Sequence, residues 1–468
     1  MGKYTIKSKD LTKIGYNNDV ARSVAMSLTS KHFKHSPKDE VLRLLVELKD
    51  NPDNFLQHEA LAPLANKLLC KTGGVKFTSH ELRIGTRDFQ IYGGKDIDGV
   101  AKRQIELAMS LPIAVRGALM ADAHVGFGLP VGGVLATDNA VIPFAVGVDI
   151  GCRMALSIFE MPEKYLQMNA YAMKKALAQY THFGMEGSLE FSQAHEVLDR
   201  EEFAATDLLR KLHGTAARQL GSSGGGNHFV EFGLIDLFEN NVLGMAPGKY
   251  VSLLTHSGSR GMGAAIAKHY TNIAMETCKL PREAKQLAWL SLDSEAGQEY
   301  WMSMNLAGDY ARACHDVIHH NLSKAIGEKA ATKVENHHNF AWRDKLSNGQ
   351  EVIIHRKGAT PAHDGELGII PGSMTTGCYL VSGKGVEQSL YSSSHGAGRR
   401  LSRGKAKETF TGSAMKKLLS EAAVTLIGGS TEECPLAYKD IEKVMQAQKS
   451  LIDVQGKFMP KIVRMNKE

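Results

Sequence analysis

Four short stretches of the sequence place metal-binding side chain types beside glycines or at the ends of apolar segments. The stretches are VGVDIGCRM, GSSGGGNHFVEFG, LLTHSGSRGMG and ENHHNFAW. They contain the candidates Asp149, Cys152, Asn227, His228, Glu231, His256, His337, His338 and Asn339. Glycine lets the backbone approach an ion closely, and imidazole, thiolate and carboxylate together form a ligand set for a divalent metal. Each stretch alone is compatible with a turn or core role, but one metal cleft explains all four at once.

A fifth stretch, SSSHGAGRRLSRGKAKETF, surrounds a single histidine, His395, with small side chains and then with cations. Five cations fall within residues 399–407, after a Gly-Ala-Gly turn. Such a turn followed by Arg and Lys suits phosphate oxygens. A charge run also forms many solvated faces, and His395 could equally be a turn histidine bonded to its serines. These residues by themselves leave both interpretations open.

The composition is that of a globular protein large enough for one big core or two ordinary ones. The chain has 468 residues, 43% of them hydrophobic, with 46 Gly, 13 Pro and no biased tract, which excludes a fibrous or disordered class. The net charge of +6 permits an anionic partner but does not by itself indicate nucleic acid.

The cysteines and the first residues bear on the location of the protein. Six scattered cysteines without a CxxC pair predict a reduced, cytoplasmic protein. The start, MGKYTIKSKD, lacks the apolar segment of a secretory signal, and no apolar run reaches ~18 residues. We therefore expect no membrane association.

The candidate side chains must be positioned by a fold with both helices and strands. Residues 1–75 show helical spacing of apolar positions, and residues 75–100 look like strands and turns. A helix is expected over DGVAKRQIELAMSL, followed by glycine-rich β segments, a mixed middle region, a second strand-rich stretch and a helical C-terminal region. Glycine-punctuated strands joined by helices predict mixed layers around a cleft. We expect a mostly helical extension at residues 1–90 and one catalytic domain at residues 91–468.

Nine short motifs follow one another from about residue 98 to the C-terminus. They are ADAHVGFGLPVGG, VGVDIGC, GGGNHFVE, HSGSRGMG, HHNF, HRKGAT, IIPGSM, SHGAGR with SRGKAK, and AYKDI. On these motifs, and on their order, the chain resembles the RtcB family of RNA-splicing ligases. The resemblance implies an α+β fold, in which mixed β-sheets pack together and are flanked by helices around a metal-containing cleft. Residues 1–90 look like an extension that compact members of the family lack.

The resemblance also implies a reaction. Ligases of this family join RNA ends that bear a 2′,3′-cyclic phosphate or a 3′-phosphate to ends that bear a 5′-hydroxyl, with GTP as co-substrate and Mn²⁺ as cofactor. The reaction passes through a covalent histidine–GMP intermediate and an activated RNA 3′ end. Carried onto this chain, the guanylylated residue is His395. Neutral imidazole can attack phosphorus when nearby cations stabilise the developing charge.

For the metal, the resemblance implies two Mn²⁺ ions. One ion is assigned to Asp149, Cys152 and His228, and the second to Cys152, His256 and His338, so that the thiolate bridges them. The side chain types alone would instead favour Zn²⁺, because Mn²⁺ lies lowest in the order of divalent metal affinities.

For the guanine nucleotide, the resemblance implies contacts from several of the motifs. They are Asn227, Glu231, Asn339, Pro371, Gly372, Ser373, Met374, Cys378, Gly396, Ala397, Gly398 and Lys467. Cys378 stands where the family usually has a serine, and a thiol is a weaker hydrogen-bond partner than a hydroxyl. We therefore expect guanine affinity or selectivity to differ. Lys467 matches the family's C-terminal lysine only after a shift.

Three arginines are candidates for contacts to RNA phosphate or to the triphosphate, because Arg presents a rigid fork of donors. They are Arg260, Arg399 and Arg403. Asp122, in ADAH, is a candidate carboxylate just outside the metal ligands. The expected partners are GTP and RNA with the ends described above. The need for an activating protein is left open, as is the oligomeric state, with a monomer favoured.

Two alternative functions remain at this point. A two-metal cleft also suits a phosphoesterase that acts on RNA 3′ or cyclic phosphates with water as nucleophile, and it gives His395 no covalent role. A non-catalytic RNA-binding paralogue is expected to have lost metal ligands, whereas all five are present. Splicing of tRNA halves and repair of broken RNA need the same chemistry. Residues 1–90 could cap the domain, bind RNA or bind a partner protein.

Overall fold

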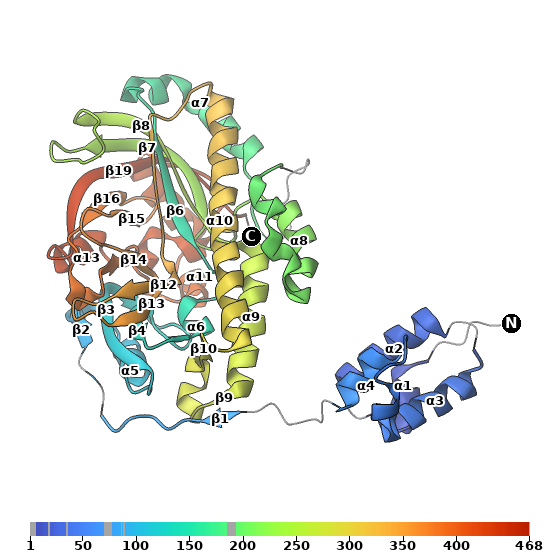
Figure 1. The fold of residues 1–468 in the computed structure, drawn as a ribbon. Coiled ribbons are helices and arrows are strands. Elements are labelled where there is room, and N and C mark those ends of the chain that lie inside the picture. The colour runs from blue at the N-terminus through green and yellow to red at the C-terminus, as the bar shows by residue number, and fades with distance from the viewer. Residues whose placement is uncertain are drawn as a thin grey trace. The chain divides into compact units, whose positions relative to one another are not determined.

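The computed structural model describes residues 6–16, 19–33, 36–69, 77–85, 87, 89–184 and 193–467. The chain separates into two units, Met1–Phe77 and Thr78–Glu468 (Figure 1). In the described ranges, none of the helices combines length with apolar character in the way that crossing a bilayer requires.

The first unit consists of helices around a core of its own. The helices are α1 (Ser8–Lys13), α2 (Asp19–His32), α3 (Lys38–Asp50) and α4 (Ala62–Leu69). Helix α3 buries Val41, Leu45 and Leu48, which recur at the spacing of one helix face. They pack with Leu11 of α1 and Leu64 of α4. The helical spacing predicted for residues 1–75 is confirmed in the described part of that range.

The second unit begins before residue 90, where the sequence analysis placed the boundary. Strand β1 (Thr78–Ser79) pairs in parallel with β9 (Cys278–Lys279), and β2 (Phe89–Ile91) pairs in parallel with β3 (Ala114–His124). These hydrogen bonds attach both strands to the second unit. Residues 75, 76, 86 and 88, where strands and turns were expected, lie outside the described ranges.

The larger sheet has eight strands in the order β11-β6-β8-β7-β19-β16-β15, with β18 paired in parallel to β19. In that order the strands are Thr332–His337, Arg153–Ile158, Gly248–Ser257, Phe229–Leu237, Ile452–Met465, Cys378–Gly383, Leu367–Pro371 and, for β18, Thr425–Ile427. Neighbours along the main path are antiparallel. One end of this sheet, which we call the shared edge, therefore holds the starts of β6, β7 and β16 and the ends of β8, β11, β15 and β19.

A second sheet has five strands in the order β12-β13-β4-β3-β2. Its remaining strands are β12 (Asn339–Lys345), β13 (Glu351–Lys357) and β4 (Val131–Thr137). Two short pairs complete the strands of the second unit: β5 (Ala140–Val141) with β10 (Leu290–Ser291), and β14 (Ala359–Pro361) with β17 (Ser392–Ser394). Strand β17 leads directly into His395.

Helices flank these sheets (Figure 1). They are α5 (Gly99–Met109), α6 (Pro143–Val146), α7 (Glu163–Tyr180), α8 (Asp207–Gln219), α9 (Arg260–Thr277), α10 (Glu295–Ile326), α11 (Arg403–Thr409), α12 (Gly412–Glu421) and α13 (Ile441–Ala447). The long helix α10 packs Ile318 and Leu322 against Val251 and Leu253 of β8. Helices and mixed sheets together confirm the predicted α+β class.

The prediction of a helical C-terminal region is wrong for the last element. After α13 ends at Ala447, the chain forms β19, which pairs with both β7 and β16. Pro460 stands in this strand, where it cannot donate to the ladder, and the register of β19 against β7 shifts between Pro460 and Ile462. The strand is stabilised by partners on both sides, which its local sequence does not reveal.

Candidate metal and nucleotide site

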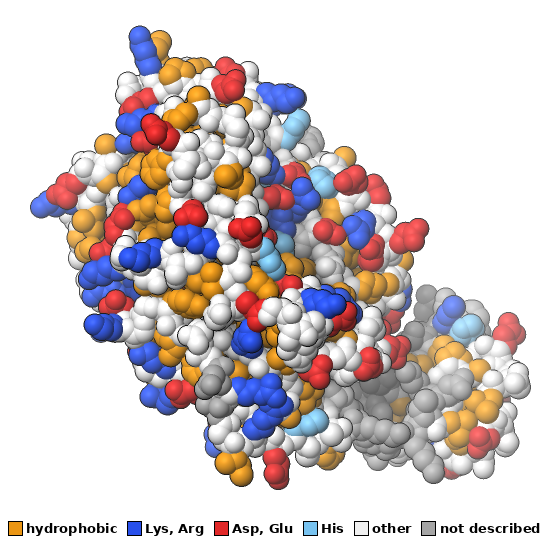
Figure 2. Space-filling model, turned by 60° about the vertical axis from the view of Figure 1, so that its left-hand side comes forward, with side chains coloured by type: hydrophobic (Ala, Val, Ile, Leu, Met, Phe, Trp, Pro, Cys, Tyr) orange, Lys and Arg blue, Asp and Glu red, His pale blue; other side chains and the backbone are white. Residues whose placement is uncertain are grey.

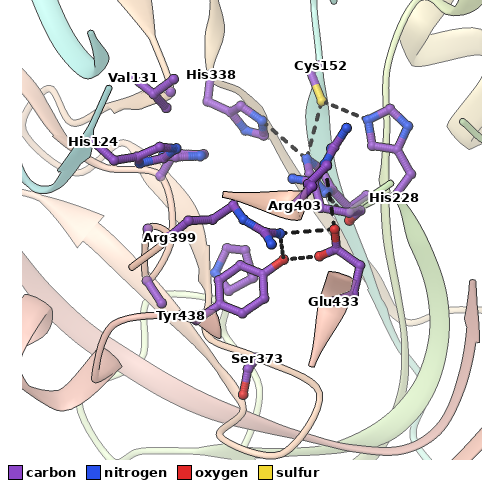
Figure 3. Close-up of a pocket in the computed structure, with 18 of the residues that line it drawn as sticks. His124, Val131, Cys152, His228, His338, Ser373, Arg399, Arg403, Glu433 and Tyr438 are labelled. Atoms are coloured by element: carbon purple, nitrogen blue, oxygen red, sulfur yellow. Dashed lines mark hydrogen bonds and ion pairs between the residues drawn. The ribbon is translucent and has the colours of Figure 1, made fainter. Parts of the chain in front are cut away.

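The shared edge of the large sheet and the adjacent ends of β3, β4, β12 and β13 enclose a cleft of about 880 Å³ (Figure 3). All five predicted metal ligands and His395 line it. The antiparallel order of the strands is the reason that residues far apart in the sequence meet there. Register places Met154 of β6 and Phe229 of β7 on either side of His256 in β8.

The predicted metal ligands form one cluster. The Sγ atom of Cys152 lies 3.4 Å from Nε2 of His228 and 3.2 Å from Nε2 of His256. Nε2 of His256 lies 3.3 Å from Nε2 of His338, and Oδ2 of Asp149 lies 3.0 Å from Nε2 of His228. Cys152 is central, because its sulfur contacts a histidine on each side, and Figure 3 shows Cys152, His228 and His338 converging.

Two glycines make room for this cluster. A Cβ atom on Gly258 would lie 2.1 Å from Oδ1 of Asp149, and one on Gly224 would lie 2.0 Å from Nδ1 of His228. Real side chains do not tolerate such distances, so glycine is required at both positions for the ligands to approach. Gly224, noted in the sequence beside His228, and Gly258, noted beside His256, therefore have a steric role.

The chemistry of the cluster fits a divalent cation. Nδ1 of His256 lies 3.0 Å from the carbonyl oxygen of Asn227, to which it donates, so that Nε2 keeps its lone pair toward the cluster. Burial and the neighbouring His228 lower the pKa of His256 to about 3, which keeps the ring neutral. Burial and the Asp149 carboxylate raise the pKa of Cys152 well above its usual range, and a bound cation would favour the thiolate instead. These donor types do not by themselves select Mn²⁺ over Zn²⁺.

His395 lies beside the cluster and is held by Asp122. The ring of His395 is centred 5.0 Å from the ring of His338. Its Nδ1 lies 2.6 Å from Oδ2 of Asp122, and the same oxygen accepts from the backbone N–H groups of His395 and Gly396 at 3.2 and 3.3 Å. With Nδ1 donating to the carboxylate, Nε2 carries the lone pair.

The Asp122 carboxyl is fully buried and ionised. Burial by itself raises the pKa of Asp122, but the neighbouring imidazoles of His395 and His124, the ammonium of Lys439 and the hydrogen bond from His395 outweigh it and hold the pKa below its usual range. Lys439 donates to the carbonyl oxygens of Ala121 and Ala123 at 3.2 and 2.7 Å, which fixes the strand on either side of Asp122.

The predicted nucleotide contacts gather at the same cleft, with one exception. The lining includes Asn227, Glu231, Asn339, Pro371, Gly372, Ser373, Met374, Cys378, Gly396, Ala397 and Gly398. Lys467 is exposed and does not line the cleft, although Met465 just before it does. The amide of Asn339 donates to the carbonyl of Asp149 at 3.3 Å and accepts from the N–H of Gly358 at 2.8 Å, so it also braces two of the loops.

Two buried groups in the nucleotide region are neutral. Burial raises the pKa of Glu231 to about 8. Burial, and then the neighbouring Glu231 carboxyl, raise the pKa of Cys378 well above its usual range, so it presents a thiol rather than a thiolate. N–H groups of a ligand that donate to Glu231 would favour its ionised form and lower its pKa.

The three predicted phosphate contacts differ in their surroundings. Arg399 and Arg403 line the cleft, and both are paired with Glu433, at 3.0 and 3.7 Å. The ring of Tyr438 lies 5.0 Å from the Arg399 guanidinium and its hydroxyl donates to Glu433 (Figure 3). Arg260 is not among the lining residues of the described chain and donates from Nε to Oγ of Ser222 at 3.1 Å.

Several lining residues were given no role from the sequence, among them His124, Lys357, Glu433 and Tyr438. The first two and Tyr438 lie within the motifs ADAHVGFGLPVGG, HRKGAT and AYKDI, so the motifs were the available signal, whereas Glu433 lies in none of them. Burial lowers the pKa of Lys357 to about 7. Its ammonium donates to the backbone carbonyl oxygens of Phe127 and Phe144.

Comparison with known proteins gives matches over most of the chain. A family model described as "tRNA-splicing ligase RtcB" matches residues 104–466. The RNA-splicing ligase RtcB of Escherichia coli strain K12 is 31% identical over 391 residues, which cover 77% of this chain and 93% of that protein. The tRNA-splicing ligase RtcB of Nanoarchaeum equitans is 32% identical over 71% of this chain and 84% of its own length. That of Methanococcus maripaludis is 30% identical over 69% and 82%.

Proposed function

Because the chain belongs to the RtcB family of tRNA-splicing ligases, we propose that it is an RNA ligase that works through a covalent GMP adduct on His395. Its substrates are RNA ends with a 3′-phosphate or 2′,3′-cyclic phosphate and ends with a 5′-hydroxyl, and its co-substrate is GTP. The observation that supports this most directly is the contact between Nδ1 of His395 and the buried Asp122, beside the cluster of predicted metal ligands. The setting is tRNA splicing or RNA repair.

In the first step, Nε2 of His395 attacks the α-phosphorus of GTP. A P–N bond forms, the bond to the bridging oxygen breaks, and pyrophosphate leaves. Asp122 holds the Nδ1 proton and stabilises the positive charge that develops on the imidazole. Two Mn²⁺ ions, held by Asp149, Cys152, His228, His256 and His338, would supply positive charge for the phosphate oxygens.

In the following steps, an oxygen of the RNA 3′-phosphate attacks the phosphorus of the adduct, and the P–N bond breaks. His395 is thereby released as a neutral imidazole, with its proton still on Nδ1 and donated to Asp122. The 5′-hydroxyl of the second RNA then attacks the 3′-phosphorus, loses its proton and expels GMP. Arg399 and Arg403 offer guanidinium groups to the phosphates at the rim of the cleft, positioned by Glu433.

A sealing assay tests the proposal. An RNA with a 3′-phosphate and a 5′-hydroxyl, incubated with the protein, GTP and Mn²⁺, is expected to become circular, and omission of GTP is expected to prevent this. Removal of the terminal phosphate without joining, independent of GTP, would contradict the ligase and support the phosphoesterase, in which water is the nucleophile.

Replacement of Asp122 by asparagine is expected to slow formation of the GMP adduct by about 10²–10⁴-fold, because an amide no longer fixes the Nδ1 proton or stabilises imidazolium. The measurement is the initial rate of labelling with α-³²P-GTP. Asp344→Asn is the matched control, since Oδ2 of Asp344 pairs with His363 at 3.1 Å outside the cleft. An equal effect of both substitutions would show that Asp122 acts only through the fold.

Binding of guanosine is expected to strengthen as the pH rises toward 8. The pKa of Glu231 is raised to about 8, so the carboxyl is neutral below that pH, whereas the N–H donors of guanine favour the ionised form. If only that form binds, affinity increases about 50-fold from pH 6 to pH 8 and then levels off. Calorimetry with guanosine, which lacks titrating phosphates, measures this. Glu231→Gln is expected to give a flat profile, and an equally steep profile in this variant would reject the assignment.

A further inference from the structure

Three apolar side chains stand exposed at the rim of the cleft. Among the described lining residues, the large hydrophobic ones that are exposed are Val125, Phe127 and Val148, and the Phe127 ring is 68% accessible. Val148 directly precedes the predicted metal ligand Asp149. The group is continuous with the proposed RNA site, and no step proposed above uses it.

The loop that carries Phe127 is braced by side chains at four backbone groups, the N–H and carbonyl of Gly126, the carbonyl of Phe127 and the N–H of Gly128. The amide of Gln104 accepts from the N–H of Gly126 at 3.1 Å and donates to its carbonyl at 2.5 Å. The N–H of Gly128 donates to Oε1 of Gln286 at 2.9 Å, and Lys357 donates to the carbonyl of Phe127. The loop therefore holds an exposed aromatic ring in a fixed position, which lowers the entropic cost of binding a partner.

The glycines on either side of Phe127 allow this conformation. Gly128 has a φ of +69°, a left-handed backbone that suits glycine, and a Cβ on Gly126 would lie 2.7 Å from the carbonyl oxygen of Leu129. The backbone is thus folded tightly beneath the ring while the ring itself points away from the core. A phenyl group that only filled the core would be buried.

The loop is linked to the reacting histidine. Lys357 binds the carbonyl of Phe127, and the next residue, Gly358, is so close to His395 that a Cβ on it would lie 3.0 Å from Cε1 of the imidazole. Phe127 and His395 line the same cleft, so an RNA nucleotide whose 3′-phosphate reaches the GMP adduct can place its base against Phe127. The 5′-hydroxyl of the second RNA later attacks the phosphorus of that 3′-phosphate. It must approach from another direction, because GMP is the leaving group.

We propose that Phe127, which lines the cleft together with the exposed Val125 and Val148, is the stacking platform for the nucleobase of the RNA nucleotide that carries the 3′-phosphate. Aromatic stacking accepts every base, so the platform would bind RNA ends without strong sequence preference. On the face shown in Figure 2, Lys and Arg side chains lie among acidic and apolar ones. The inference rests on the proposed function, from which it takes the identity of the substrate.

The test uses a short RNA with a 3′-phosphate and 2-aminopurine as its last base, mixed with the full chain without GTP. Stacking quenches the fluorescence of 2-aminopurine. Wild type and Phe127→Tyr are expected to quench it, whereas Phe127→Leu is expected to bind about tenfold more weakly, with little quenching. Phe238→Leu, a partly exposed phenylalanine outside the cleft, is the matched control and is expected to behave as wild type.

A second probe with 2-aminopurine at a 5′-hydroxyl end assigns the platform to one end. Undiminished quenching of the first probe by Phe127→Leu, or a loss seen only with the second probe, would overturn the inference. GTP-dependent sealing by the wild-type chain, measured in parallel, decides the proposed function separately. Phe127→Trp is expected to bind at least as tightly as wild type, which a purely structural role for Phe127 would not produce.

Discussion

The His395→Ala protein is expected to form no covalent adduct with GTP, a fall in the labelling rate of at least about 10⁴-fold. The imidazole supplies the only proposed nucleophile for the α-phosphorus, and alanine leaves nothing in its place. Wild type incubated with α-³²P-GTP and Mn²⁺ should carry a label that is labile in acid and stable in alkali, as expected for a P–N bond. The labelled band is measured after denaturing electrophoresis.

The matched control for this substitution is His363→Ala. His363 also pairs with an aspartate, Asp344, but lies outside the cleft, so its loss is expected to leave labelling near the wild-type level. A His395→Ala protein that still accepts label would place the adduct elsewhere. A wild-type protein that is never labelled, yet releases phosphate from RNA, would favour the phosphoesterase.

The Cys152→Ala protein is expected to lose both metal affinity and adduct formation. The Cys152 sulfur contacts His228 and His256, so its removal takes a donor from each half of the cluster. Since changes outside a ligand set already weaken metal binding by about 10–100-fold, we expect at least about 100-fold for this one. The readout is thermal unfolding, because a metal that binds only the folded state stabilises it by ~2.7 kcal/mol at 100 times its dissociation constant.

Addition of Mn²⁺ should therefore raise the melting temperature of wild type and leave that of Cys152→Ala almost unchanged. Cys278→Ala is the matched control, because Cys278 is a buried free thiol in β9, outside the cleft. It is expected to respond to Mn²⁺ as wild type does. An equal response in Cys152→Ala would show that the cluster does not hold the ion, and repeating the titration with Zn²⁺ tests the preference that the donor types suggest.

The sequence by itself was sufficient to identify the cluster of candidate metal ligands. The side chain types of Asp149, Cys152, His228 and His256 suggested one metal cleft, and the structure brings these four together. The ability of these side chains to bind a metal depends on their residue types, which the sequence states directly. The glycines beside them mark positions where the backbone must approach the ligands closely, so both signals are local. The order of the motifs indicated the family for the same reason, and the comparisons show that family.

The tertiary structure alone decided how these groups act on one another. Residues 122 and 395 are separated by 273 positions, and only the packing of β3 beside β17 brings the carboxylate of Asp122 to Nδ1 of His395. Tertiary packing also brings Arg399 to Glu433 and Lys357 to the carbonyl oxygen of Phe127. The strand β19 was mistaken for helix because its neighbours β7 and β16 lie far away in the sequence. The periodicity of apolar residues indicates which face of a segment is buried. The positions of protons, the stability of buried charges and the pairing of strands depend instead on atoms that other segments supply.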